Sequence, residues 1–173
     1  MIFFGHLGLT TGVFNLYEKL LKDKHHIGKN TIDYRFVLAG SILPDLIDKP
    51  IGALIFRNTF HNSRIFAHTL LFSVILLILG IFYYRKSLKS SILLLGICSL
   101  IHLALDSMWE YKEIMFWPYY GLKFPARPEG DWLKEDIIHL LSNPIYLIPE
   151  IVGFLIILYN FIKFIKRKRL ICR

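Results

Sequence analysis

Histidines and carboxylates recur beside the apolar stretches of this 173-residue sequence. Imidazole nitrogens and carboxylate oxygens together suit Zn, Mn or Fe. A bound divalent ion would also offset the cost of placing several carboxylates close to lipid. We therefore expect a site for a divalent metal ion, with zinc as the first choice and manganese or iron as alternatives. The candidate site residues are His6, Asp45, Asp48, Arg64, His68, His102 and Asp106.

Two pairs of these residues have helical spacing. Asp45 and Asp48 are three apart, and His102 and Asp106 are four apart, so each pair would share one face of a helix. A histidine that donates to an aspartate is also a common structural pair, so the second pair is equally compatible with a purely structural role. Glu150 follows a proline in a later apolar stretch. A metal ligand, a partner of a ligand histidine and a proton carrier all remain open for it.

A third set of polar residues precedes the most apolar stretch. His61, Arg64 and His68 follow one another at steps of three and four. If one helix extends through HNSRIFAH, the three side chains project from a single stripe. Arg64 would then be placed to steady an anionic substrate.

The composition indicates a membrane protein with one domain, residues 1–173. Hydrophobic residues make up 54% of the chain, charged residues 20%, and the mean hydropathy is +0.47, against an apolar share of about 45–50% in soluble domains. The net charge of +8 does not indicate a nucleic-acid partner, because the basic residues flank apolar segments instead of interleaving with a polar, aromatic surface.

The apolar segments predict an all-α, polytopic membrane bundle of about five helices. Residues 67–84, 91–106 and 144–165 are each long and apolar enough to cross most or all of a hydrocarbon core of about 30 Å. Residues 2–21 and 36–48 are less apolar or shorter, and we expect partial or bundle-buried helices there. Pro44 and Pro50 bracket the second carboxylate pair, which predicts a helix break near Asp45.

The distribution of Lys and Arg predicts the orientation in the membrane. With five helices of alternating direction, segments 22–35, 85–90 and 163–173 share one side and hold 13 basic residues in 31 positions. Segments 49–65 and 107–143 share the other side, with 7 in 54. We expect the denser side to be cytoplasmic. The chain would then be a multi-pass protein of the cell membrane, with its basic C-terminal tail in the cytoplasm.

On this topology the candidate site residues fall near the extracytoplasmic ends of the helices. Ionisable residues at membrane depth are expensive and by default indicate a functional site. A single histidine in an apolar helix is more often a hydrogen-bonded residue between helices, but six histidines and aspartates at one level favour a shared site. The aromatic stretch 116–132 contains Trp117 and Trp132, which suit an interfacial belt or the lining of a substrate entrance.

Four short motifs occur in order along the chain: GH at 5–6, LPDLID at 43–48, AHTLLF at 67–72 and HLALD at 102–106. Their order, spacing and membrane context resemble the YdjM-like family of membrane-bound metal-dependent hydrolases, up to the FWP at 116–118. The resemblance implies an activity without naming a substrate, and it implies that Asp48 matches the second acid of a PDxD-like motif. The implied metal ligands are His6, Asp45, His68, His102 and Asp106.

The sequence departs from the family pattern before His68. Family members often have a compact histidine-arginine-glycine run followed by threonine-histidine-serine, whereas this chain has HNSRIFAHT. His61 is therefore not counted among the ligands, and Arg64 remains an anion contact.

The expected activity is hydrolysis of a phosphoester or similar ester, lipid-linked or itself a membrane lipid, at the extracytoplasmic membrane surface. A metal ion that activates water requires no serine or cysteine nucleophile. Asp48 would orient a ligand or act as base, and Arg64 would bind the anionic substrate. One alternative is a non-enzymatic site for binding or transporting a metal ion or proton. Another is a membrane anchor with a basic tail, and the oligomeric state is left open.

Overall fold

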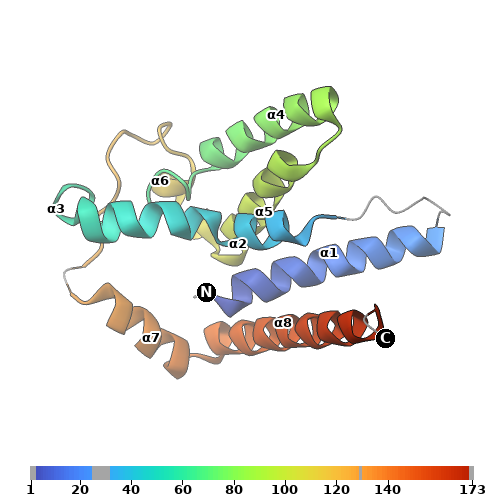
Figure 1. Cartoon of the computed structure of the whole chain (residues 1–173). Coiled ribbons are helices and arrows are strands. Elements are labelled where there is room, and N and C mark those ends of the chain that lie inside the picture. Colours follow the sequence, from blue (N-terminus) through green and yellow to red (C-terminus); the bar gives the residue numbers. More distant parts are fainter. Residues whose placement is uncertain (1–2, 25–31, 129, 172–173) are drawn as a thin grey trace. The chain divides into compact units, whose positions relative to one another are not determined.

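The computed structural model describes residues 3–24, 32–128 and 130–171, and these residues form helices and loops without a β-strand. The predicted all-α class is confirmed (Figure 1). The described residues divide into two compact units, Met1–Thr31 with Asp131–Arg173, and Ile32–Gly130. The helices of the first unit are α1 (Phe4–Lys24), α7 (Trp132–Ser142) and α8 (Pro144–Ile171). Those of the second are α2 (Tyr34–Asp48), the π-helical η1 (Lys49–Ile55), α3 (Arg57–Phe60), α4 (Leu70–Ser87), α5 (Ser91–Leu105), the 3-10 helix η2 (Met108–Glu110) and α6 (Lys112–Met115).

In the first unit, α1 packs along α8. Gly8 and Gly153 lie at the crossing, where a Cβ on either glycine would collide with the backbone of the other helix. This close approach is typical of helices that pack in lipid through small residues. Asn15 donates a hydrogen bond to Asn160 at 3.3 Å, which ties the two helices together further along.

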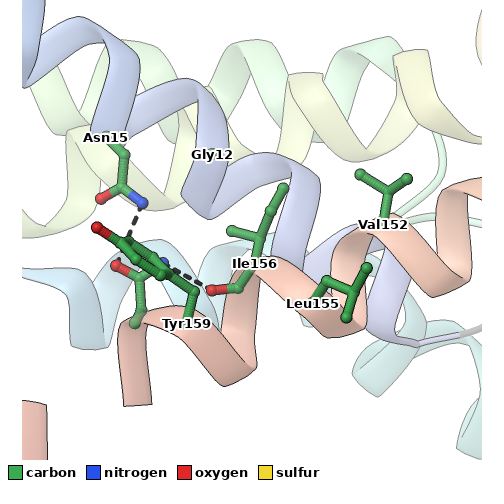
Figure 2. Close-up of a pocket in the computed structure, with 7 residues that line it drawn as sticks. Gly12, Asn15, Val152, Leu155, Ile156 and Tyr159 are labelled. Carbon is green, nitrogen blue, oxygen red and sulfur yellow. Dashed lines mark hydrogen bonds between the residues drawn. The ribbon is translucent and has the colours of Figure 1, made fainter. Parts of the chain in front are cut away.

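An open, mainly apolar groove of about 330 Å³ runs beside this hydrogen bond. Figure 2 shows Gly12 on α1 facing Ile156 on α8, with Val152 and Leu155 along the same side of α8. Tyr159 lies next to the asparagine pair in this view. The groove contains no acidic or histidine side chain among its described lining residues, so it is not part of the candidate metal site.

In the second unit, α5 packs against both α2 and α4. Gly96 of α5 allows the backbone of α4 to approach at Leu77. Ser73 and Ser99 form a buried hydrogen bond of 2.9 Å between α4 and α5. The helix α5 is thus the shared partner of the other two, and it holds His102 close to both.

The predicted helix count and number of spans are not confirmed in the described part of the chain. It contains eight α-helices instead of about five, and two of them have the length and hydropathy to cross a membrane, Leu70–Ser87 and Pro144–Lys166. The predicted third span is apolar but forms a helix of only 15 residues, Ser91–Leu105, about 22 Å long at 1.5 Å per residue. The extra helices α3, α6 and α7 arise in segments read as connections. The basic segments 22–35 and 163–173 lie partly outside the described residues.

The predicted break near Asp45 is wrong. The helix α2 runs through Pro44 to Asp48 and is followed directly by η1, which contains Pro50. Pro44 has no backbone N–H, so one helical hydrogen bond is missing there. Packing of the buried face of α2 against α5 keeps the helix continuous in spite of this. In η1 the hydrogen bonds span five residues instead of four, and Phe56 N–H donates to the Ile51 carbonyl at 2.8 Å.

The predicted stripe of His61, Arg64 and His68 is also wrong, because α4 begins only at Leu70. Thr69 is its N-cap, with extended backbone and a side-chain oxygen that accepts a hydrogen bond from Phe72 N–H at 3.1 Å. His61 ends α3 in the left-handed conformation, with φ of 47°. Residues 61–69 therefore form a loop, and His68 approaches α5 from that loop.

Candidate metal centre

Asp45, His68 and His102 meet within the second unit, although they come from three different elements. One ligand atom of each lies within 4.8 Å of the others. His68 Nε2 is 3.3 Å from His102 Nε2 and 3.5 Å from Asp45 Oδ1. His102 Nε2 is 4.0 Å from the same carboxylate oxygen. The two imidazole rings are fully buried, and the Asp45 side chain is 12% exposed.

Hydrogen bonds on the far side of each ring determine which nitrogen carries the proton. His102 Nδ1 lies 2.7 Å from the carbonyl oxygen of Ser41, which can only accept, so this nitrogen donates. His68 Nδ1 lies 2.7 Å from a carboxylate oxygen of Asp48, and it donates in the same way. In the neutral rings both Nε2 atoms therefore present lone pairs toward each other, which is the arrangement that metal-ligating histidines adopt.

Asp48 organises the loop that carries His68. Its carboxylate is fully buried and accepts backbone N–H bonds from Ile65 at 2.8 Å, Ala67 at 3.0 Å and His68 at 3.0 Å. Together with the bond from the His68 ring, these contacts satisfy both carboxylate oxygens. Asp48 thus lies behind His68, on the opposite side of the ring from Asp45.

The electrostatics of the centre favour positive charge. Burial opposes ionisation of Asp45, but the hydrogen bond with His68 and the charge of Lys49, whose Nζ is 2.7 Å away, hold the pKa of Asp45 well below its usual value. Burial likewise opposes protonation of His68, but its hydrogen bonds to Asp45 and Asp48 raise the pKa of His68 above its usual value. The carboxylates therefore stabilise a cation near the two rings.

Asp106 and Arg64 form the edge of the centre. Arg64 Nη2 is 2.9 Å from Asp106 Oδ2, and the same oxygen is 4.0 Å from His68 Nε2. The Arg64 guanidinium also lies over the ring of Tyr111, 5.6 Å from its centroid. Its side chain is 27% exposed, compared with 2% for Asp106, so Arg64 is the more accessible of the two groups.

His6 and Glu150 belong to the first unit, and both are buried. The Glu150 carboxylate accepts a hydrogen bond from Phe3 N–H at 3.1 Å, at the start of α1. His61 is exposed, and its carbonyl accepts from Arg127 N–H at 2.8 Å. The second unit thus brings together the other candidates, Asp45, Asp48, Arg64, His68, His102 and Asp106.

Three contributors were missed at the sequence level. Ser41 contributes a main-chain carbonyl, for which the sequence gives no signal. Lys49 follows Asp45 by four positions in a helix, so an ion pair with it was readable from spacing. Tyr111 lies five residues after Asp106 in the segment beyond α5 and meets Arg64 only through the fold.

The YdjM inner membrane protein family matches residues 1–171. The chain belongs to this family. The resemblance read from the four motifs is thereby confirmed, and the membrane location agrees with the two apolar helices α4 and α8. No match was found among curated proteins or among solved structures.

The donor set of this YdjM-family chain fits a small divalent ion. Metal–ligand bonds of about 2.0–2.2 Å in a tetrahedral site separate neighbouring ligand atoms by about 3.3–3.6 Å. The separations from His68 Nε2 to His102 and to Asp45 are 3.3 and 3.5 Å, and the third separation is 4.0 Å. Two imidazoles and one carboxylate also match the ligand chemistry of zinc, manganese and iron.

Proposed function

We propose that this protein is a membrane-bound, metal-dependent hydrolase that cleaves a phosphoester or similar ester. Asp45, His68 and His102 would hold a divalent ion, zinc first and manganese or iron as alternatives. The observation that carries this proposal is the pair of buried Nε2 atoms 3.3 Å apart, beside a carboxylate oxygen. Asp106, whose family motif implies metal ligation, is proposed as a further ligand of this site or of a second ion. The family motif implies ligation by His6 as well, which stays a prediction from the sequence.

The residues around the metal ligands have separate tasks in this proposal. Asp48 orients His68 by accepting its Nδ1–H, and the Ser41 carbonyl does the same for His102. N–H groups of the loop and of the His68 ring occupy both oxygens of Asp48, which supports the orienting role over that of a general base. Arg64 binds the anionic group of the substrate, and Asp106 holds its guanidinium in place.

When bound, a divalent ion would supply Lewis acidity and lower the pKa of a water molecule, so the chain needs no serine or cysteine nucleophile. The buried walls around His68 and His102 exclude bulk water. The low local dielectric strengthens the attraction between the Arg64 guanidinium and a phosphoryl oxygen.

We also propose a multi-pass arrangement with the basic tail in the cytoplasm and the metal centre at the extracytoplasmic boundary. His68 lies two residues before α4 begins at Leu70, so the centre is at one end of an apolar helix of spanning length. The density of Lys and Arg supports the opposite end as cytoplasmic. A substrate that is a membrane lipid, or linked to one, fits this position.

A metal-ion or proton site without hydrolysis is the second candidate, because the same buried ligands would serve a transported ion. Turnover separates the two candidates. A transport or storage protein should release no product from any phosphoester, whereas a hydrolase should turn over at least one class of ester in a metal-dependent manner.

The decisive experiment is elemental analysis of purified protein beside a His68→Ala, His102→Ala double variant and a His139→Ala control. His139 is exposed on α7, so the control removes one histidine without touching the centre. We expect metal in the wild type and in the control, with loss in the double variant. Wild-type protein without metal after metal-replete growth would overturn both the hydrolase and the metal-ion site. If metal is present, turnover of phosphoester and phospholipid panels in detergent decides between hydrolysis and metal binding or transport.

A further inference from the structure

The segment Phe116 to Phe124, here called the aromatic loop, packs against the loop that carries His68. Trp117 and Phe124 stack on each other with ring centroids 5.7 Å apart. Both contact Phe66 edge to face, at 5.4 and 5.1 Å. Asn62 also donates to the Pro125 carbonyl at 2.7 Å. The aromatic loop is therefore fixed in place beside the metal centre.

The position of Phe66 sets the depth of the aromatic loop. Phe66 comes four residues before Leu70, where α4 begins, and α4 has the length and hydropathy of a membrane span. The chain beyond α5 returns to the same end, because buried Met108 and Ile114 pack against Leu103 near the end of α5. The aromatic loop thus lies level with one end of an apolar helix pair, where a bilayer has its headgroup boundary.

The outer side chains of the aromatic loop suit that boundary. Tyr119, Tyr120 and Leu122 are 86%, 57% and 78% exposed, which is unusual for adjacent large apolar residues in contact with water. Tyrosines place an apolar ring in lipid and a hydroxyl in the headgroup layer. Lys123 is exposed beside them, and its charge complements anionic headgroups.

We propose that the aromatic loop inserts into the headgroup–acyl boundary of the bilayer and delivers a lipid headgroup sideways to the metal centre. Resting on the proposed function, this assigns the substrate class as an anionic amphiphile, whose chains stay in the bilayer while its anionic group reaches Arg64. Arg64 is accessible, and it lies over the ring of Tyr111, which is itself 45% exposed. Trp117 is half-buried and packs against Phe66 and Phe124, so it supports the loop instead of extending from it.

The test places a polarity-sensitive fluorophore on Leu122→Cys in a Cys172→Ser background, with the buried Cys98 retained. The full-length protein is reconstituted in phosphatidylethanolamine–phosphatidylglycerol vesicles. Ile78→Cys, exposed in the middle of α4, provides the lipid reference, and Glu135→Cys, exposed on α7, provides the aqueous reference. Lipids with a nitroxide near the acyl carbonyl should quench the label at position 122 several-fold more than the label at 135, and aqueous iodide should quench it several-fold less.

Equal quenching of positions 122 and 135 by iodide would overturn the insertion. The measurement is made with and without a metal chelator, so it does not depend on the metal. If the loop is inserted but the protein binds no metal, the insertion holds and the hydrolase proposal fails. If the loop is exposed to iodide in a metal-loaded, active enzyme, the hydrolase proposal holds and the insertion fails.

The substrate class has its own test once turnover is measured. Leu122→Ser and Tyr119→Ser together should raise the KM for a vesicle-borne phospholipid several-fold, while the KM for a soluble short-chain phosphoester stays unchanged. An equal rise for both substrates would overturn the assignment of the loop to lipid delivery.

Discussion

His68 and His102 face each other through their Nε2 atoms at 3.3 Å, although 34 positions separate them in the chain. The protein engages the opposite nitrogen of each ring, one with the Asp48 carboxylate and one with the Ser41 carbonyl. With both Nδ1 atoms donating, the two Nε2 atoms can share a proton on His68, which its raised pKa favours, or bind a metal ion. The nearby Asp45 oxygen adds negative charge, which stabilises a cation in either form.

Replacing Asp48 by Asn should weaken metal binding without removing a metal ligand. The amide keeps the side-chain shape but has no negative charge and only one accepting oxygen, so it holds His68 Nδ1–H less strongly. Loss of such an outer partner typically costs about 10–100-fold in metal affinity. Competition with a chromophoric chelator measures the change. Asp33→Asn is the matched control, because Asp33 caps α2 with a partly exposed side chain, outside the candidate centre. Equal affinities for wild type and Asp48→Asn would remove Asp48 from the centre.

Replacing Arg64 by Gln should weaken the binding of anions. Hydrogen bonds to charged groups contribute about 1.5–3 kcal/mol, so inhibition by inorganic phosphate should weaken by about 10–100-fold. Elemental analysis of the same preparation reports whether metal is retained. Arg35→Gln, which removes an exposed arginine paired with Asp33, should leave inhibition unchanged. If inorganic phosphate inhibits Arg64→Gln as strongly as the wild type, Arg64 does not bind the anion and serves only in its ion pair with Asp106.

Hydropathy predicted the positions of the long helices because burial in lipid or in the bundle determines where they form. It did not predict their ends, which depend on local hydrogen bonds. The start of α4 is an example, since the N-cap Thr69 separates His68 from the helix. An apolar run directly after a threonine is a readable N-cap signal, so this error was avoidable. The continuation of α2 through Pro44 was not, because tertiary packing maintains it.

The candidate site was predictable in its residue types and much less so in its geometry. Helical spacing suggested that Asp45 and Asp48 act on one face, but the structure places them on opposite sides of His68. Three N–H groups of a loop turn toward Asp48 and determine this arrangement. Loop backbone has no sequence period, so the contact could only come from the fold.

Packing of α1 on α8 predicts a contrast between two glycines. Gly153→Ala should destabilise the protein, because the added Cβ would collide with the backbone of Phe4 and Gly5, and overpacking costs about 1–3 kcal/mol. Gly12→Ala should have a much smaller effect, because its Cβ would lie 3.2 Å from the flexible end of Ile156. Thermal unfolding in detergent compares the two. Equal unfolding midpoints would contradict the close crossing.

The two ends of α4 predict labelling from opposite sides of the membrane. The helix has 18 residues and a length of about 27 Å, so Ser87 and the loop segment beside its start should be separated by the hydrocarbon core. In a Cys172→Ser background, Ser87→Cys should react with a membrane-impermeant maleimide only in inside-out vesicles. Ala126→Cys, exposed just beyond the aromatic loop, should react only in right-side-out vesicles.

Each deviation from that labelling pattern has a distinct meaning. Exchange of the two patterns would reverse the orientation and place the metal centre in the cytoplasm, where it would act on the inner leaflet. Labelling of both positions from one side would mean that α4 does not cross the bilayer. The second outcome would also remove the depth argument for the aromatic loop, since that argument takes the start of α4 as the membrane boundary.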